Sequence, residues 1–358
     1  MENTVTYIGI AVSSVAALVF AYAMGLFSWK NHMPVEGKTI LLTGASEGMG
    51  RSAALKLAAR GANLVVVARN GQRLEELVTE LKASAKNPQT QRFTSLTADI
   101  SKEGFAAPLL DKATAWNNGR APDIVWCVAG MATPGLFAES PFSVLRRNLD
   151  VNFYGTAELS HAVLRAWLAP DADADAKPNP NRTDAAATPK HLIMTSTVAA
   201  LYPVAGYSLY IPGKAALRAL ADTLAQEVLL YPGRDVRVHV VYPGTITSPG
   251  YERENLTKPG ITHELEDIDP VQTPDQCAEA AIRGLEAGQY FVTVAWLGHL
   301  MRWGALGGSV RNNWVVDTLM GLLTPLVFVF VIPDIFGKVK AYAKKHGHPS
   351  TYIKNVPS

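Results

Sequence analysis

Short apolar runs rich in β-branched residues alternate with amphipathic stretches along most of the chain. Each run has the length and composition of a strand, and each intervening stretch has the apolar spacing of a helix. Strand and helix in regular alternation are typical of a parallel sheet that helices cover on both faces. The pattern therefore predicts an α/β protein whose single domain is built on a doubly wound parallel sheet. The expected strands are residues 39–42, 63–68, 123–128, 191–196 and 236–241.

A long uncharged segment precedes the first expected strand. Residues 5–27 contain no Asp, Glu, Lys or Arg, and a helix of this length would cross the ~30 Å hydrocarbon core of a bilayer. A cleaved signal peptide is the alternative, but it would have a shorter apolar core preceded by positive charge. Lys30 and His32 follow the segment whereas Glu2 precedes it, so the positive-inside rule places the rest of the chain in the cytosol. We expect an N-terminal transmembrane helix within residues 1–30.

A second uncharged segment, residues 318–333, lies near the other end of the chain. Pro325 would break or kink a helix in its middle, so a second span, a re-entrant or interfacial hairpin and a buried core helix all remain open. The lysines that follow suit the anionic cytosolic surface of a membrane. We expect residues 301–358 to form a membrane-associated segment with a basic tail. These lysines are Lys338, Lys340, Lys344 and Lys345.

The folded domain is expected between these two ends, over residues 36–300. It is interrupted by residues 169–189, which are rich in Ala, Asp, Asn and Pro and show no apolar period. Such a composition cannot bury a face against a core. We therefore expect a disordered surface insertion there, with no chemistry assigned to it.

Composition and charge narrow the functional classes. Hydrophobic residues make up 48% of the chain and charged residues 18%, below the roughly 25% of average soluble proteins, which agrees with apolar segments outside a globule. The net charge is +2, and no basic run is interleaved with aromatic residues, so we expect no nucleic-acid partner. Cys127 and Cys277 are the two cysteines of the chain. They form neither a disulfide framework nor a zinc site, so we expect a reducing compartment and no metal.

A glycine-rich loop follows the first expected strand. The segment Thr43-Gly44-Ala45-Ser46-Glu47-Gly48-Met49-Gly50 leads directly into a helical pattern. Glycines permit a tight turn there and let a diphosphate approach the N-terminus of a helix, where free N–H groups favour anions. An ordinary glycine turn is the alternative. The position between the first strand and a helix favours a Rossmann-like dinucleotide site that includes Gly44, Ser46, Glu47, Gly48 and Gly50.

The end of the second expected strand indicates which dinucleotide binds. Arg69 follows Gly50 by 19 residues, at the point where an NAD site would place an acid on the ribose 2′-hydroxyl. Arg69, with Arg73 one helical turn later, would instead pair with a 2′-phosphate, although two solvated surface arginines are the alternative. Asp99 could accept a hydrogen bond from the adenine amine. The sequence therefore predicts NADPH as the cofactor.

A candidate catalytic group follows the fourth expected strand. Tyr210 and Lys214 are four residues apart, so they share one face of a helix, and Pro212 is compatible with the first turn of that helix. A nearby cation lowers the pKa of a phenol toward the range in which it can act as an acid or base. Ser196, 14 residues before Tyr210, could hydrogen-bond a carbonyl oxygen as charge develops on it. Thr197 is the adjacent alternative.

Together these residues resemble the short-chain dehydrogenase/reductase family, whose layout residues 36 to about 300 follow. The resemblance implies that Tyr210 is the proton donor, that Lys214 holds the nicotinamide ribose and tunes Tyr210, and that Ser196 orients the substrate carbonyl. Asn152 matches the family's helix asparagine, which carries a water relay. A spacing of thirteen residues, common in the family, would select Thr197, but we favour Ser196.

Two further segments bear on the resemblance. Cys127-Val128-Ala129-Gly130 departs from the family's usual Asn-Asn-Ala-Gly, which affects side-chain hydrogen bonding there but not the approach of the backbone to the cofactor. Thr245 and Thr247 follow Pro243-Gly244 and match the loop that covers the nicotinamide. We therefore add both threonines to the expected cofactor site.

The segments 245–252 and 257–259, with the two hydrophobic ends, are similar to a membrane-bound subgroup of this family. That resemblance implies NADPH-dependent reduction of a long-chain sphingoid-base ketone, 3-ketodihydrosphingosine, at the endoplasmic reticulum membrane, with the catalytic domain in the cytosol. Membrane lipid would then be a partner, and a homo-oligomer stays open. The alternatives are a membrane-bound hydroxysteroid or retinoid dehydrogenase and an NADP-sensing scaffold without turnover.

Overall fold

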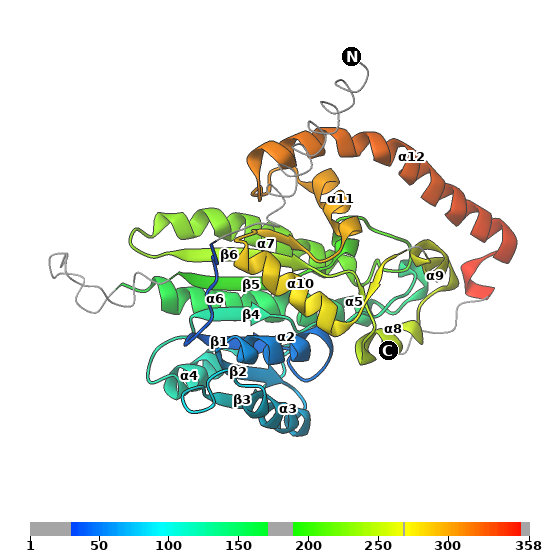
Figure 1. Ribbon diagram of the computed structural model, residues 1–358. Coiled ribbons are helices and arrows are strands. Elements are labelled where there is room, and N and C mark those ends of the chain that lie inside the picture. The colour runs from blue at the N-terminus through cyan, green and yellow to red at the C-terminus, as the bar shows by residue number, and fades with distance from the viewer. Residues whose placement is uncertain (1–29, 171–188, 268, 352–358) are drawn as a thin grey trace, which may run out of the picture.

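The fold is built on one parallel sheet of seven strands (Figure 1), and the computed structural model describes residues 30–170, 189–267 and 269–351. The strand order is β3-β2-β1-β4-β5-β6-β9, so the direction of winding reverses between β1 and β4. The doubly wound, Rossmann-like sheet expected from the sequence is thus confirmed. The strands are β1 (Thr39–Thr43), β2 (Asn63–Ala68), β3 (Phe93–Thr97), β4 (Ile124–Cys127), β5 (Lys190–Thr195), β6 (Val236–Tyr242) and β9 (Phe291–Thr293).

Helices cover both faces of the sheet and form two separate hydrophobic cores. Successive side chains of a strand point to opposite faces, so Ile40 and Leu42 pack into one core while Leu41 packs into the other. This two-sided burial explains why the central strands read as continuous apolar runs. One layer contains α2 (Gly48–Ala59), α3 (Gly71–Ala83) and α10 (Pro274–Glu286), and the other contains α4 (Ala106–Trp116), α6 (Gly155–Leu168) and α7 (Ile211–Glu227).

Several smaller elements lie around the carboxyl ends of the strands. A π-helical turn, Asp150–Tyr154, joins α5 to α6 without a break. The loop after β6 forms a two-stranded parallel ladder of β7 with β8, and two short helices lie between these strands in sequence. These elements are α5 (Phe142–Leu149), β7 (Thr245–Ile246), α8 (Pro249–Asn255), α9 (Gly260–Glu266) and β8 (Val271–Gln272).

The second uncharged segment of the sequence belongs to one continuous helix, α12 (Trp314–His346), which follows α11 (Trp296–Ala305). Pro325 and Pro333 both lie inside α12. Pro325 therefore does not end the helix, and α12 curves over the domain (Figure 1). The hydroxyl of Thr324 donates to the Met320 carbonyl oxygen at 2.6 Å. With 33 residues, α12 is long and apolar enough to cross a membrane.

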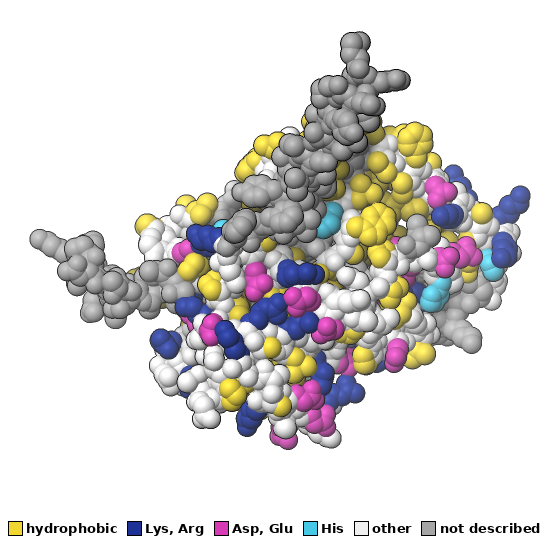
Figure 2. Space-filling view, viewed as in Figure 1, with side chains coloured by type: hydrophobic (Ala, Val, Ile, Leu, Met, Phe, Trp, Pro, Cys, Tyr) yellow, Lys and Arg dark blue, Asp and Glu magenta, His cyan; other side chains and the backbone are white. Residues whose placement is uncertain are grey.

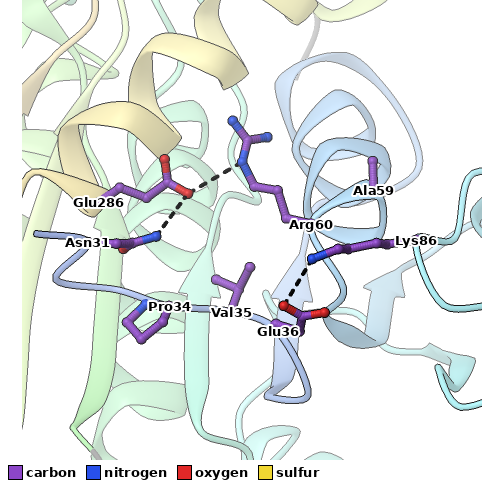
Figure 3. A pocket seen from close by; sticks show the side chains of 8 residues that line it. All are labelled: Asn31, Pro34, Val35, Glu36, Ala59, Arg60, Lys86 and Glu286. Carbon is purple, nitrogen blue, oxygen red and sulfur yellow. Dashed lines mark hydrogen bonds and ion pairs between the residues drawn. The ribbon is translucent and has the colours of Figure 1, made fainter. Parts of the chain in front are cut away.

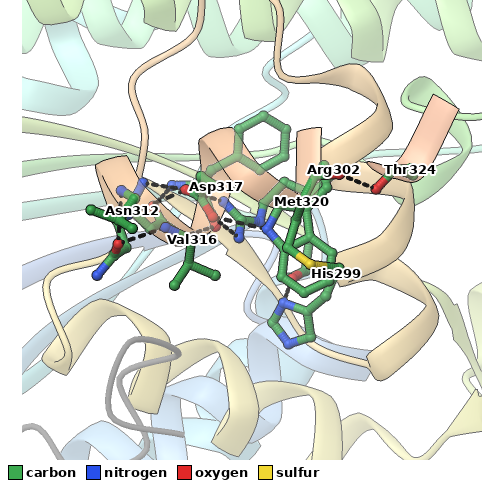
Figure 4. A network of polar contacts seen from close by, with 12 residues as sticks. His299, Arg302, Asn312, Val316, Asp317, Met320 and Thr324 are labelled. Carbon is green, nitrogen blue, oxygen red and sulfur yellow. Dashed lines mark hydrogen bonds and ion pairs between the residues drawn. The ribbon is translucent and has the colours of Figure 1, made fainter. Parts of the chain in front are cut away.

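A buried ion pair fixes the start of α12 to α11 (Figure 4). Arg302 donates to both carboxylate oxygens of Asp317, at 2.8 and 2.6 Å. The indole of Trp303 and the backbone N–H of Asn312 donate to the same carboxylate, at 2.9 and 2.8 Å. Burial alone would raise the pKa of Asp317, but the Arg302 guanidinium, the Trp303 indole and the backbone N–H of Asn313 hold it below its usual range. The first turn of α12 is therefore part of the folded domain.

Two of the expected segments lie outside the described residues. These are the N-terminal transmembrane helix, within residues 1–29, and most of the expected insertion, residues 171–188.

Candidate active site

The candidate site lies at the carboxyl ends of β1, β4 and β5, where the sheet changes its direction of winding. The loop after β1 approaches the segment after β4 so closely that a Cβ on Gly44 would lie 2.6 Å from the Ala129 Cα. Gly44 and Gly48 also have positive φ, of 74° and 58°, and a Cβ on Gly50 would lie 2.2 Å from the Gly44 carbonyl oxygen. The three glycines are therefore required by the geometry of this loop, and the loop leads into the N-terminus of α2 as the sequence predicts.

Ser46 and Glu47 form the tip of this loop and are partly buried. Glu47 pairs with two arginines from different elements, with Arg73 of α3 at 2.6 Å and with Arg253 of α8. Burial alone would raise the pKa of Glu47, but Arg253 and Arg73 together lower it. A Cβ on Gly48 would lie 3.4 Å from the Ser248 side chain. The loop after β6 thus lies directly against the glycine-rich loop.

The other residues expected at the adenosine end lie after β2 and β3. Arg69 is exposed at the end of β2, and its positive charge reaches Asp99. One oxygen of Asp99 accepts hydrogen bonds from the backbone N–H and the hydroxyl of Ser101, at 3.1 and 2.8 Å. Burial would raise the pKa of Asp99, but the Ser101 donors and Arg69 lower it. The structure thus places Arg69 and Asp99 close together, with Arg69 open to solvent.

Tyr210 and Lys214 lie at the start of α7, in the arrangement that the sequence predicts. Tyr210 is the N-cap of the helix, and Pro212 lies in its first turn. Lys214 is buried, and its ammonium donates to the Thr195 carbonyl oxygen at 2.8 Å. Burial lowers the pKa of Lys214 to about 8. The Lys214 ammonium therefore faces the end of β5, about one helical turn after Tyr210.

The two hydroxyl side chains that follow β5 have different surroundings. Ser196 is buried and donates to the main-chain carbonyl oxygen of Lys214 at 2.8 Å. The Thr197 hydroxyl instead donates to the Pro243 carbonyl oxygen at 3.4 Å and accepts from the Ala199 N–H at 3.3 Å. Burial raises the pKa of Tyr210, the charge of Glu254 raises it further, and the Thr197 side chain lowers it. Thr197 thus acts on the Tyr210 phenol, whereas the favoured Ser196 is bonded to the backbone of α7.

Asn152 lies in the π-helical turn between α5 and α6 and is fully buried. Its side chain makes two hydrogen bonds with the backbone of Met131, accepting from the N–H at 3.0 Å and donating to the carbonyl at 2.8 Å. A Cβ on Gly130 would lie 3.0 Å from both the Asn152 Oδ1 and the Lys214 Nζ. Asn152, Gly130 and Lys214 therefore meet at one point of the site.

Cys127 and the two threonines after β6 complete the set of sequence-predicted residues. Cys127 is buried at the end of β4, and burial raises the pKa of its thiol to about 12. Thr245 pairs with Val271 in the β7–β8 ladder, and the exposed Thr247 is bonded through its backbone N–H to the Gln272 carbonyl at 3.0 Å. The ladder thus fixes both threonines beside β6.

The sequence reasoning missed a group of charged residues next to Tyr210. Glu254 and Lys258 form an ion pair at 3.0 Å, and the hydroxyl of Tyr207 donates to Glu254. The ring centroids of Tyr207 and Tyr210 are 5.9 Å apart. The four-residue spacing of Glu254 and Lys258 was the only available signal, and it does not indicate that this pair lies beside α7.

A separate pocket lies at the opposite end of the sheet (Figure 3). Its wall contains ion pairs between Arg60 and Glu286 at 3.4 Å and between Lys86 and Glu36 at 2.9 Å. Arg60 follows the C-terminus of α2, and Glu36 precedes β1. The pocket is therefore remote from the carboxyl ends of the strands. Within residues 30–170, 189–267 and 269–351, the structure has no group of His, Cys, Asp and Glu arranged to hold a metal.

Comparison with known proteins agrees with this geometry. Residues 38–258 match the family model described as short chain dehydrogenase. The chain is 55% identical to 3-ketodihydrosphingosine reductase gsl-3 of Neurospora crassa over 96% of this chain and 93% of that protein. It is 40% identical to 3-ketodihydrosphingosine reductase ksrA of Aspergillus fumigatus over 97% of this chain and 96% of that protein.

The fold is also similar to solved structures. A short-chain dehydrogenase from Sphingobium yanoikuyae in complex with NADPH superimposes with a TM-score of 0.59 and 22% identity. The match covers 76% of this chain and 92% of that one.

Proposed function

Because the chain belongs to the short-chain dehydrogenase family, we propose that it is an NADPH-dependent oxidoreductase that reduces a ketone to an alcohol. The ketone is 3-ketodihydrosphingosine, a long-chain sphingoid-base ketone, and the product is dihydrosphingosine, as in sphingolipid synthesis. The observation that carries the substrate is the 55% identity, over nearly the full length of both chains, to a relative that bears this name. The residues that carry the chemistry are Tyr210, Lys214 and Thr197.

The described residues fit NADPH. Gly44, Gly48 and Gly50 leave no side chain between the backbone and a diphosphate at the N-terminus of α2, where free N–H groups bind anions. Arg69 takes the position of the acid that would hold the 2′-hydroxyl of NAD, and it is exposed and free to bind a 2′-phosphate. Ser46, Glu47, Asp99, Thr245 and Thr247 complete the proposed cofactor site, together with Arg73.

The chain supports reduction by donating a proton and by orienting the carbonyl. NADPH, when bound, supplies the hydride. Burial keeps the Tyr210 phenol protonated, which is the form that donates a proton to the developing alkoxide. Thr197, whose side chain lowers the pKa of Tyr210, orients the carbonyl oxygen, so we replace Ser196 by Thr197 in the proposed catalytic set.

Lys214 and Asn152 support the residues that react with the substrate. The positive charge of Lys214 lowers the free energy of a phenolate on Tyr210, and its ammonium is positioned to hold the nicotinamide ribose. Asn152 fixes the backbone at Met131 through two hydrogen bonds. We propose that the same asparagine carries the proton relay to solvent.

We further propose that the protein works at the cytosolic face of the endoplasmic reticulum membrane. Residues 1–30 form the anchor, 36–300 the reductase domain and 301–358 the second membrane-associated segment, whose start the buried Arg302–Asp317 pair holds in the folded domain. Large apolar side chains are exposed along α12, in the upper part of Figure 2. A long-chain ketone dissolves in the bilayer because each methylene contributes about 0.8 kcal/mol to leaving water. The exposed apolar residues include Leu319, Leu322, Leu326, Val329, Phe330 and Phe336.

α12 contacts the segment that follows Thr197. Phe328 stacks on Tyr202 with ring centroids 5.4 Å apart, and Tyr202 follows Thr197 by five residues. A membrane-bound helix is thereby connected to the segment that carries the proposed carbonyl-binding hydroxyl. This contact supports delivery of the substrate from the bilayer.

The experiment uses the purified full-length protein in detergent with NADPH and 3-ketodihydrosphingosine. We expect loss of NADPH absorbance and formation of dihydrosphingosine, and loss of both in Tyr210→Phe. Because the substitution removes only the phenol hydroxyl, Tyr210→Phe should still bind NADPH. A wild-type protein that forms no dihydrosphingosine, or a Tyr210→Phe variant with full activity, would contradict the proposal.

A further inference from the structure

A cluster of four side chains with interlocking polar contacts lies beside Tyr210, and we call it the Glu254 cluster: Tyr207, Glu254, Lys258 and Glu266. The Lys258 side chain is 1% exposed. Its ammonium lies 3.0 Å from the Glu254 Oε1 and 2.7 Å from the Glu266 Oε2. The Tyr207 hydroxyl donates to the same Glu254 Oε1. The cluster therefore holds two carboxylates on one buried ammonium.

The cluster is assembled from four places in the fold. Glu254 is near the end of α8, Lys258 lies in the turn before α9, and Glu266 ends α9. Tyr207 precedes α7, and its ring lies 5.6 Å from the Lys258 ammonium, which is also 4.8 Å from the Tyr251 ring. The aromatic rings and the carboxylates hold Lys258 in one place. The position of Glu254 relative to α7 is fixed by these contacts.

The charges of the cluster do not balance. Glu254 and Glu266 carry two negative charges against the single positive charge of Lys258. Asp269 is a third carboxyl group near Glu266, and burial together with the charge of Glu266 raises the pKa of Asp269 to about 6. A partly buried site with a net negative charge favours the binding of a cation.

Glu254 has one carboxylate oxygen available for such a cation. Its contacts with Tyr207 and Lys258 both use Oε1. No residue that the structure describes donates a hydrogen bond to Oε2. The Glu254 side chain is 17% exposed, so it is accessible from the site without being solvated on all sides.

Glu254 also acts on the reacting phenol. The rings of Tyr207 and Tyr210 are 5.9 Å apart, and the negative charge of Glu254 is one of the causes that raise the pKa of Tyr210, after burial. The carboxylate is therefore within electrostatic reach of the point where the substrate carbonyl must bind. Arg253, the residue before Glu254 in α8, pairs with Glu47 of the glycine-rich loop.

We propose that Glu254 determines substrate specificity by binding the ammonium group that the ketone carries on the carbon next to its carbonyl. This inference rests on the proposed function, because 3-ketodihydrosphingosine is a 2-amino ketone. The carbonyl oxygen and the ammonium sit on adjacent carbon atoms, so a ketone bound to Tyr210 presents its ammonium to the neighbouring side chains. The ammonium then supplies the positive charge that the Glu254 cluster lacks.

A purely structural role for Glu254 makes a different prediction. If the cluster only holds α8 and α9 in place, loss of the Glu254 charge affects every ketone equally. If Glu254 binds the ammonium, the loss depends on whether the substrate has one. Two ketones that differ only in the amino group therefore separate the two roles.

The experiment compares the long-chain 2-amino-1-hydroxy-3-ketone with the same ketone without its amino group, using NADPH and full-length protein in detergent. Glu254→Gln keeps the size of the side chain and removes its charge. A hydrogen bond to a charged group contributes about 1.5–3 kcal/mol, so we expect a loss of about tenfold to a hundredfold in kcat/KM for the amino ketone, chiefly in KM. The ketone without the amino group should lose less than about threefold. Glu252→Gln, exposed on the same helix, is the matched control and should behave as wild type.

The wild-type enzyme provides a test that does not depend on the folding of the variant. It should prefer the amino ketone over the ketone without the amino group by about tenfold or more in kcat/KM. Equal loss on both ketones in a folded Glu254→Gln variant, or no wild-type preference, would overturn the inference while leaving the proposed function standing. A wild-type enzyme that reduces neither ketone would overturn the proposed function and this inference together.

Discussion

The hydroxyl of Ser196 donates a hydrogen bond to the main-chain carbonyl oxygen of Lys214, 2.8 Å away. This bond places Ser196 against the backbone of α7, while the side chain of the next residue, Thr197, lowers the pKa of Tyr210. Successive side chains of an extended segment point in opposite directions, so only one of the two hydroxyls can face the phenol. The first prediction follows from this arrangement.

Thr197→Val should lower kcat by about a hundredfold, because it removes a hydroxyl that would stabilise charge on the carbonyl oxygen. Ser196→Ala should retain most of the turnover and lower the free energy of unfolding by about 1 kcal/mol, the contribution of a typical buried hydrogen bond. Steady-state reduction of the ketone and chemical unfolding of both variants provide the measurement. Greater loss of turnover in Ser196→Ala than in Thr197→Val would return Ser196 to the catalytic set.

The choice between these two hydroxyls shows where the sequence stops being informative. Tyr210 and Lys214 were predictable because helical spacing alone places them on one face. Whether Ser196 or Thr197 orients the carbonyl depends on which of the two side chains faces the Tyr210 phenol after the end of β5. The contact between Glu254 and Tyr207 depends on how α8 packs, and no local pattern specifies that packing.

The fold shows the same division. β1 and β2 were predictable because both faces of these strands are buried, and they therefore read as continuous apolar runs. β3, Phe93–Thr97, is an edge strand with no fully buried residue, and β9 has only three residues. Neither strand has an apolar run long enough to be recognised. Pro325 misled the interpretation of α12 because packing on α11 keeps the helix continuous where its own sequence would interrupt it.

The second prediction concerns the carboxylate in the glycine-rich loop. Glu47 lies in the proposed cofactor site but pairs with Arg73 at 2.6 Å, so there it competes with a 2′-phosphate for that arginine and adds a negative charge near it. Glu47→Gln should therefore lower the Kd for NADPH by about threefold to tenfold and leave the Kd for NADH nearly unchanged. Fluorescence titration of both cofactors measures this, with Glu75→Gln on the exposed face of α3 as the control. Weaker NADPH binding in Glu47→Gln would show that Glu47 supports Arg73 and does not compete for it.

Arg69 provides the third prediction. Arg69→Ala should weaken NADPH much more than NADH, by about tenfold or more, because a charge-assisted contact to the 2′-phosphate is lost for the phosphorylated cofactor alone. Arg92→Ala, which removes a guanidinium stacked on Trp116 away from the loop, is a control for the loss of a surface arginine. Equal losses for both cofactors would assign Arg69 to the solvated surface.

The fourth prediction concerns acid stability and a buried pair of histidines. His191 Nδ1 lies 3.0 Å from His239 Nε2, and His239 Nδ1 lies 2.8 Å from the Gln289 carbonyl oxygen. Burial lowers the pKa of His191 to about 3 and that of His239 to about 4, and the charge of Arg237 acts in the same direction on both. Both rings are therefore neutral in the folded protein at physiological pH.

The sign of the pH dependence follows from these shifts. In the unfolded chain a histidine has a pKa of about 6.5, so between pH 6.5 and about 4 the unfolded state binds more protons than the folded state. The free energy of unfolding should therefore fall as the pH drops through this window, by about 2 kcal/mol for each histidine at pH 5. Chemical unfolding in detergent at pH 7 and pH 5 tests this. A double variant, His191→Asn with His239→Gln, should depend less steeply on pH over the same range, and an unchanged slope would contradict the assignment.

The last prediction connects the buried ion pair of α11 and α12 to activity on a long-chain ketone. Asp317→Asn leaves the Arg302 charge buried without its partner, which costs about 3–5 kcal/mol and should release the first turn of α12. Release should expose the connection 306–313 to protease and should weaken the stacking of Phe328 on Tyr202, close to Thr197. We therefore expect lower activity on the long-chain ketone, with a smaller loss on a short water-soluble ketone that needs no delivery from a bilayer. Asp334→Asn, which removes an exposed pair with Lys338 on the same helix, should change neither proteolysis nor activity. If Asp317→Asn increases proteolysis but leaves the long-chain activity intact, α12 takes no part in the delivery of substrate.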